Sequence, residues 1–152
     1  MQTVMLKKDF IINNQLSFNS NMTFSPDHNL FMIIASKTDI AVTSDILSRY
    51  RKVKNSLSSK SIDIASYEYR LTLDAISKTN PLLRSHLSND FDEAYKKAIF
   101  YEVVSDIKND KKKQAQLKLR SIIFSRLEYF ILFLLLMFPL SNQFLMRILK
   151  RW

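Results

Sequence analysis

The sequence predicts a mostly helical α/β fold. Apolar residues recur at helical spacing through much of the chain after position 25, whereas two short segments near the start, TVML at 3–6 and DIAV at 39–42, are typical of strands. The chain has 152 residues, of which 47% are hydrophobic, which is enough for one domain with a sizeable core.

The first long helix is expected at Pro26–Lys37. Ser25 is a good N-cap residue, proline suits the first helical position, and Asp27 lies where the positive end of a helix favours a negative charge. The apolar body of this helix would consist of Leu30, Phe31, Ile33, Ile34 and Ala35.

Two further helices are expected between positions 61 and 110. The first runs from about Ser61 to Ser77 and is stopped near Asn80-Pro81, because proline and the residue before it disfavour helix. The second begins at a Ser88-Asn89-Asp90 cap. Its apolar face would carry Phe91, Ala94, Tyr95, Ala98 and Ile99.

The last segment, 111–152, is basic and apolar at once. From Lys111 onward it has nine Lys and Arg residues and one acidic residue, whereas the first 110 residues have 14 basic and 13 acidic ones. We expect a basic helix that continues into the apolar run YFILFLLLMFPL at 129–140, breaks at Pro139 and ends in the amphipathic LMRILKRW. No secretory signal is evident at the start of the chain.

Cations beside an apolar run indicate an anionic membrane surface as a partner, and we expect no nucleic-acid partner because the aromatic residues are not interleaved with the basic ones. The strictly apolar run of 12 residues is shorter than the roughly 17 to 25 that cross a bilayer. We therefore expect a helix lying in the interface; a spanning helix and a buried hairpin are the alternatives.

Two residue types are missing from the sequence, cysteine and glycine. Without cysteine there can be no disulfide, thiolate metal site or cysteine nucleophile. Without glycine a P-loop or a GxGxxG dinucleotide site is excluded, since both need backbone conformations that glycine supplies. Any nucleotide would have to be held elsewhere.

Few side chains suggest metal chemistry. Asp90-Phe91-Asp92 has the spacing of a DxD metal motif, but it follows a polar turn, and acidic residues are common at a helix start in any case. The two histidines, His28 and His86, are too far apart in sequence to predict a metal site, and His86 is expected at a surface or turn. We predict no metal ligands in this chain.

A longer pattern surrounds Asp27. The segments VMLKKDFIINN, LSFNSNMTFSPDHNLFMIIASK and DIAVTSDILSRYRKVKNSLSS, in this order, resemble the second half of a family 2 glycosyltransferase of the GT-A fold. In that family a phrase like FDESLRFSEDYDLFLRLA is followed by a strand and by LAKYRVHDNSLS. The Arg- and Lys-rich, leucine-rich tail is also similar to the C-terminal extension of many bacterial members. Two departures are Pro26, in place of the first acid of the ED pair, and Val53, in place of a histidine.

The resemblance implies roles for particular residues. Asp27 stands where the family has the general base, which removes the proton from the acceptor hydroxyl. His28, Tyr50 and Arg51 would bind substrate, with Arg51 available to a donor phosphate or to the acceptor. The alternative is that Asp27 only caps its helix.

The resemblance also implies a domain plan. Residues 1–60 would be the acceptor-side part of a GT-A domain, 61–110 a helical extension, and 111–152 membrane-associating helices on the cytoplasmic side of a membrane, peripheral or monotopic. The half that binds the nucleotide-sugar donor and its Mg²⁺ or Mn²⁺ would lie upstream of Met1. We therefore expect a truncated or split inverting glycosyltransferase, inactive alone, acting on a glycan or lipid-linked acceptor; the alternative is a small helical membrane-surface protein without catalysis.

Overall fold

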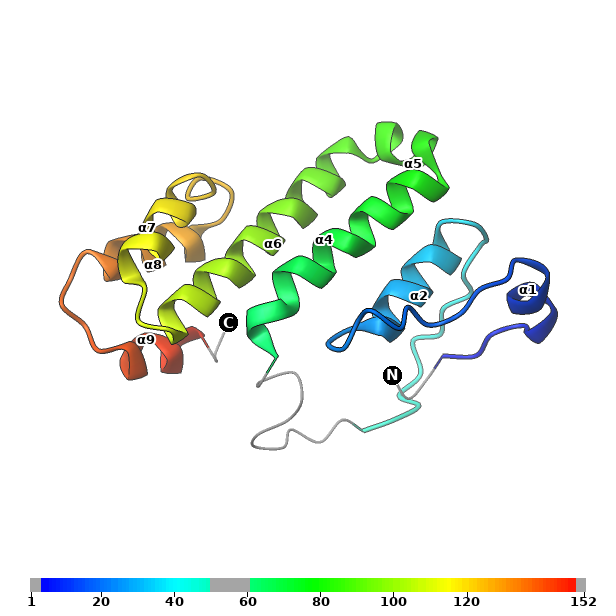
Figure 1. The fold of residues 1–152 in the computed structure, drawn as a ribbon, viewed down its shortest axis with the longest axis horizontal. Coiled ribbons are helices and arrows are strands. Elements are labelled where there is room, and N and C mark those ends of the chain that lie inside the picture. Colours follow the sequence, from blue (N-terminus) through cyan, green and yellow to red (C-terminus); the bar gives the residue numbers. More distant parts are fainter. Residues whose placement is uncertain (1–3, 50–60, 150–152) are drawn as a thin grey trace.

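The computed structural model describes residues 4–49 and 61–149, and this part of the chain is mostly helical, as the sequence predicts. Figure 1 shows a central pair of long helices with shorter helices at either side. The helices are α1 (Lys8–Asn13), α2 (Pro26–Ala35), α4 (Ile62–Thr79), α5 (Pro81–His86), α6 (Ser88–Lys108), α7 (Lys112–Arg120), α8 (Leu127–Leu136) and α9 (Asn142–Leu149).

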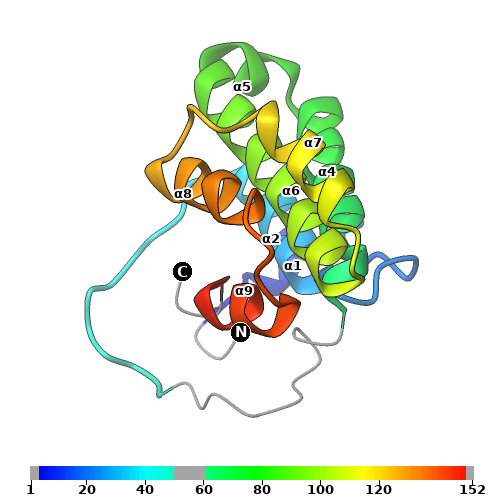
Figure 2. The same cartoon turned by 90° about the vertical axis from the view of Figure 1, so that its left-hand side faces the viewer.

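The central pair is α4 and α6, which lie side by side along most of their length (Figures 1 and 2). Their contact is lined by the buried Leu73 and Ile76 of α4 and Phe91 of α6. Both helices were predicted nearly within their bounds, because their apolar residues repeat at helical spacing. The six-residue helix α5 between them was not predicted: it follows Asn80-Pro81, where the Asn80 side chain accepts a hydrogen bond from the Leu83 amide (3.1 Å).

Helices α7, α8 and α9 pack against the C-terminal half of α6 and form the larger core. Val103 and Ile107 of α6, Leu119 of α7, Leu132 of α8 and Leu145 of α9 are all completely buried there. Residues from four helices thus share one apolar cluster, which fixes the C-terminal helices to the central pair.

A polar network at the edge of this core joins α4, α6 and α7. Glu102 accepts hydrogen bonds from Ser66 (2.9 Å) and Arg70 (3.0 Å), and the Lys118 ammonium lies 2.7 Å from a carboxylate oxygen of the buried Asp106. Burying a carboxylate is costly unless it is paired with a positive charge, and the Lys118 ammonium provides that charge for Asp106.

The expected continuous helix after Lys111 is wrong: α7 ends at Arg120, residues 121–125 form a turn, and α8 starts at Leu127. Two serine hydroxyls stabilise the turn, Ser121 donating to the Lys118 carbonyl and Ser125 to the Ile122 carbonyl. Such side-chain bonds compete with helix continuation. The apolar run therefore forms a separate helix, α8, whose Tyr129, Leu132 and Leu136 pack into the larger core.

The two expected strands are also wrong for the residues that the structure describes. Residues 4–6 and 39–42 are not in strands, and in the second segment Ile40 and Val42 are 63% and 88% exposed. A strand is stable only when it pairs with another. Neither of these described segments pairs with another strand, so their residues form irregular structure.

The absence of glycine has a visible consequence where α6 ends. Asp110 adopts a left-handed conformation (φ 60°), and the Lys111 amide donates to the Asp106 carbonyl at 2.8 Å. This is the Schellman pattern, in which glycine is usual because it has no Cβ to clash. Aspartate is one of the few other residues that tolerate this region.

Candidate functional site

The start of α2, which carries Asp27 and His28, is held by a carboxylate from α4. Glu68 is only 2% exposed, and its oxygens accept hydrogen bonds from the backbone amides of Thr23, Phe24 and Ser25 at 2.6–3.0 Å. The expected cap by Ser25 is therefore wrong in its detail, because the Ser25 side chain makes no cap bond to its own helix.

Burial would raise the pKa of the Glu68 carboxyl, but the hydrogen bonds from the three backbone amides outweigh it and hold the pKa below its ordinary value near 4.5. Glu68 is therefore ionised at neutral pH, and its charge lies at the positive end of α2.

Two more contacts fix α2 along its length. In the middle, the buried Asn29 amide donates to the Thr72 hydroxyl of α4 (3.2 Å). At the end, the Asn80 amide donates to the Ser36 carbonyl (3.1 Å). Together with Glu68, these contacts attach α2 to α4 at its start, middle and end, which positions the side chains of its first turn.

Asp27 lies in that first turn and is half-buried. Its Oδ1 accepts a hydrogen bond from the backbone amide of His28 at 2.8 Å. Asp27 thus stands where the sequence predicts it, at the start of a helix that is well anchored.

His28 is placed against α4. Its ring stacks on Tyr69, with ring centroids 5.5 Å apart and an angle of 18° between the planes. Its Nδ1 is shielded from solvent and has no hydrogen-bond partner in the described part of the protein. Burial lowers the pKa of His28 below its ordinary value near 6.5; Asp27 acts in the opposite direction, and Lys97 adds to the lowering. The imidazole is therefore neutral at pH 7.

Helix α6 adds two side chains to this cluster that the sequence did not single out. The Lys97 ammonium lies 5.7 Å from the centre of the Tyr69 ring, and Tyr101 meets Tyr69 edge-on at 5.8 Å. Lys97 and Tyr101 are four residues apart and hence on one face of α6, so the sequence alone could have predicted that these two side chains are neighbours. Nothing in the sequence indicated that this face meets Tyr69 of α4.

The cluster of Asp27, His28, Tyr69, Lys97 and Tyr101 combines a carboxylate, an imidazole, two phenols and an exposed ammonium. Such a set can accept a proton from a hydroxyl, hydrogen-bond to a polar ligand and attract an anionic group. Tyr50 and Arg51, the other predicted substrate-binding residues, lie outside the described residues.

The other candidates do not join this cluster. Asp90 and Asp92 are exposed in the first turns of α6, and His86 is exposed at the end of α5, as expected. Among the residues that the structure describes, no three histidine or acidic side chains are grouped so that they could hold a metal ion.

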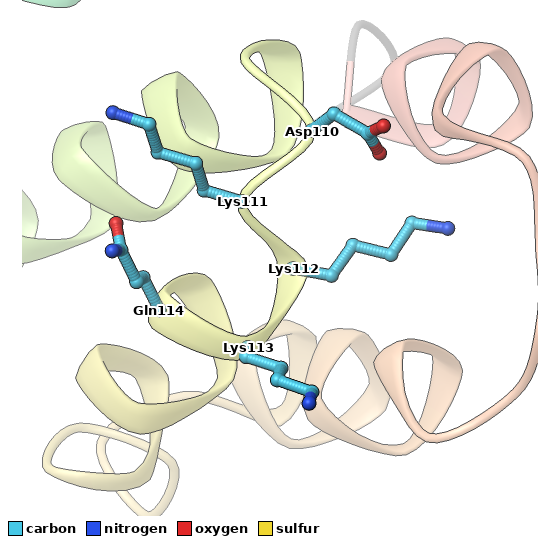
Figure 3. Close-up of a pocket in the computed structure, with 5 residues that line it drawn as sticks. All are labelled: Asp110, Lys111, Lys112, Lys113 and Gln114. Atoms are coloured by element: carbon cyan, nitrogen blue, oxygen red, sulfur yellow. The ribbon is translucent and has the colours of Figure 1, made fainter.

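A depression at the α6–α7 junction is lined by Asp110, Lys111, Lys112, Lys113 and Gln114. The three lysine side chains there point in different directions (Figure 3), and Lys112 donates to the Leu140 carbonyl. The lysines do not converge on a common ligand, and Figure 1 places α7 far from α2.

No protein-family model matches the sequence, and comparisons with curated proteins and with solved structures gave no significant match. Among the described helices, none is long and apolar enough to cross a bilayer.

Proposed function

We propose that this chain is the acceptor-side part of an inverting glycosyltransferase similar to family 2, with Asp27 as the general base. The observation that carries the proposal is the position of Asp27: it lies in the first turn of α2, beside His28, on a helix that Glu68, Thr72 and Asn80 attach to α4. A base must be held within hydrogen-bond reach of the proton that it removes.

In this reaction Asp27 takes the proton of an acceptor hydroxyl while the hydroxyl oxygen bonds to the anomeric carbon of the donor sugar. The bond from that carbon to the nucleotide phosphate breaks, and the nucleoside diphosphate leaves. Attack from the far side inverts the anomeric centre. The acceptor would be a glycan or a lipid-linked saccharide, bound by His28 together with Tyr50 and Arg51.

The donor and its Mg²⁺ or Mn²⁺ would be held by another part of the enzyme. The sequence has no glycine for a phosphate-binding loop, and the described residues offer no metal-ligand group. The active enzyme would therefore need a nucleotide-binding part in addition to these 152 residues. It would work at the cytoplasmic side of a membrane, where lipid-linked acceptors are available.

The test is Asp27→Asn in the enzyme assembled with its nucleotide-binding part. We expect transfer to fall by about two to four orders of magnitude, the usual contribution of a general base, while donor binding survives. The readout is release of nucleoside diphosphate from a panel of nucleotide sugars in the presence of a glycan extract. The matched control is Asp90→Asn, which also removes a carboxylate from a helix first turn.

Retained transfer in Asp27→Asn would remove Asp27 from the base role. Loss of transfer in both variants would show that the effect is not specific to Asp27. Circular dichroism of both variants checks that the total helix content and the thermal unfolding of the protein are unchanged.

A second function is favoured by a different observation: helix α8 has an exposed apolar face, formed by Leu127, Phe130, Ile131 and Leu134. On its own, this face would fit a helical protein that acts at a membrane surface without catalysis. Asp27→Asn would leave that function unchanged.

A further inference from the structure

Helix α8 is apolar on two opposite faces. Its inner face contributes Tyr129, Leu132 and Leu136 to the core. Its outer face carries Leu127, Phe130, Ile131 and Leu134, which follow the spacing i, i+3, i+4, i+7 and are 71%, 40%, 39% and 41% exposed. The outward face of a helix at a protein surface is normally polar.

The apolar surface extends beyond both ends of the helix. Phe124, in the turn before α8, is 91% exposed, and Met137 and Phe138, directly after it, are 64% and 61% exposed. Large aromatic and aliphatic side chains exposed together, in contrast to single ones, indicate a surface that binds something. We call these seven residues the α8 face: Phe124, Leu127, Phe130, Ile131, Leu134, Met137 and Phe138.

The charge around the α8 face is strongly positive. Residues 111–149 contain seven Lys and Arg residues and a single acid, Glu128. Lys118 is paired with Asp106, but Arg120 and Arg126, which flank the turn before α8, are exposed, as is Arg147 of α9. The partner of this surface should therefore be apolar in its interior and anionic at its border.

We propose that the α8 face inserts into the surface of a bilayer that contains anionic lipids. Acyl chains would cover the apolar side chains, and lipid headgroups would meet the arginines. A second copy of this chain fits less well, because it would bring two strongly positive surfaces together. With ten residues, α8 is about 15 Å long, half of the roughly 30 Å of a hydrocarbon core, so it lies in the interface.

The position of α8 suits this orientation. Helices α7, α8 and α9 gather at one end of the molecule, and α2 lies toward the other end, with α4 and α6 between them (Figure 1); the C-terminal end is seen face-on in Figure 2. A membrane under the α8 face would leave Asp27 and its cluster away from the lipid surface and open to the aqueous phase.

The experiment is flotation of the chain with vesicles of phosphatidylcholine alone and of phosphatidylcholine mixed with phosphatidylglycerol. We expect binding to the mixed vesicles, weakened by salt, and little binding to the neutral ones. Leu127→Gln should weaken binding by about tenfold, since it removes one inserted side chain. Leu82→Gln on α5 is the matched control, because Leu82 has the same exposed fraction of 71% and lies outside the α8 face.

Equal binding by the two variants, or no binding to mixed vesicles by the unaltered chain, would overturn the proposal. So would a dimer in sedimentation equilibrium that Leu127→Gln dissociates, because the face would then serve self-association. The result is separable from the proposed catalysis: Asp27→Asn should keep vesicle binding, and Leu127→Gln should keep transfer to a water-soluble acceptor.

Discussion

At the residue scale, the structure depends on Glu68, a single buried carboxylate that serves a helix 43 residues away. Local capping by Ser25 is what the sequence predicted, and the Ser25 hydroxyl does lie near that carboxylate, 3.3 Å from Oε2. The backbone amides at the start of α2 are nevertheless satisfied by α4. A capping partner 43 residues away in sequence cannot be recognised from the residues next to the helix start. The sequence therefore placed Asp27 at a helix start but did not identify Glu68 as the group that anchors this helix.

Glu68→Gln should destabilise the fold by about 1–3 kcal/mol at pH 7, because the NH2 group that replaces one carboxylate oxygen is a donor and cannot accept a hydrogen bond from the backbone amides at the start of α2. Urea unfolding followed by circular dichroism measures this. Glu93→Gln is the control: Glu93 is 44% exposed and pairs with Lys96 on the same helix, so its loss should cost less than about 0.5 kcal/mol. Equal costs would contradict the role of Glu68.

The pH dependence of unfolding tests the same carboxylate. The pKa of Glu68 is lower in the folded protein than its unfolded value near 4.5, so the unfolded chain binds more protons in that window and stability rises with pH. The contribution is fully present above the unfolded pKa and is lost as the pH falls through the folded pKa. Glu68→Gln should flatten the stability curve below about pH 5; an unchanged slope would contradict this.

At the element scale, the long helices were predictable and the changes of direction were not. Helices α4 and α6 repeat apolar residues over many turns, and α2 has a proline at its first position, which together fix their type and approximate bounds. The turn at 121–125 was missed because it lies between two helical patterns and contains neither glycine nor proline. The supposed strands were short apolar segments, whose type depends on a pairing partner.

The two faces of α8 should respond differently to the same substitution. Leu132→Ala should cost about 2–5 kcal/mol, because a completely buried side chain leaves a cavity in the core. Leu134→Ala, on a side chain that is 41% exposed, should change stability by less than about 1 kcal/mol. Urea unfolding of both variants is the measurement, and similar costs would show that α8 is not seated as described.

At the scale of the whole molecule, different kinds of side chain gather at the two ends of the fold. The cluster around Asp27 gathers α2, α4 and α6 at one side, and the basic, apolar helices α7, α8 and α9 gather at the other. Composition alone indicated the second end, because the positive charge and the apolar run share the last quarter of the sequence. The cluster around Asp27 could not be predicted from composition, since Tyr69, Lys97 and Tyr101 come from helices that only the packing of the fold brings close to His28.

The central proposal is that this chain acts with a nucleotide-binding part as a glycosyltransferase similar to family 2, and sequencing the DNA upstream of the Met1 codon tests it most directly. About 150 codons should be translated in all three forward frames, since this is the usual size of a domain. We expect one frame to contain a hydrophobic strand followed by a DxD motif, which would give Asp27 a donor to act on. Unrelated sequence in every frame would contradict the glycosyltransferase proposal and leave the proposed insertion of the α8 face into a membrane surface.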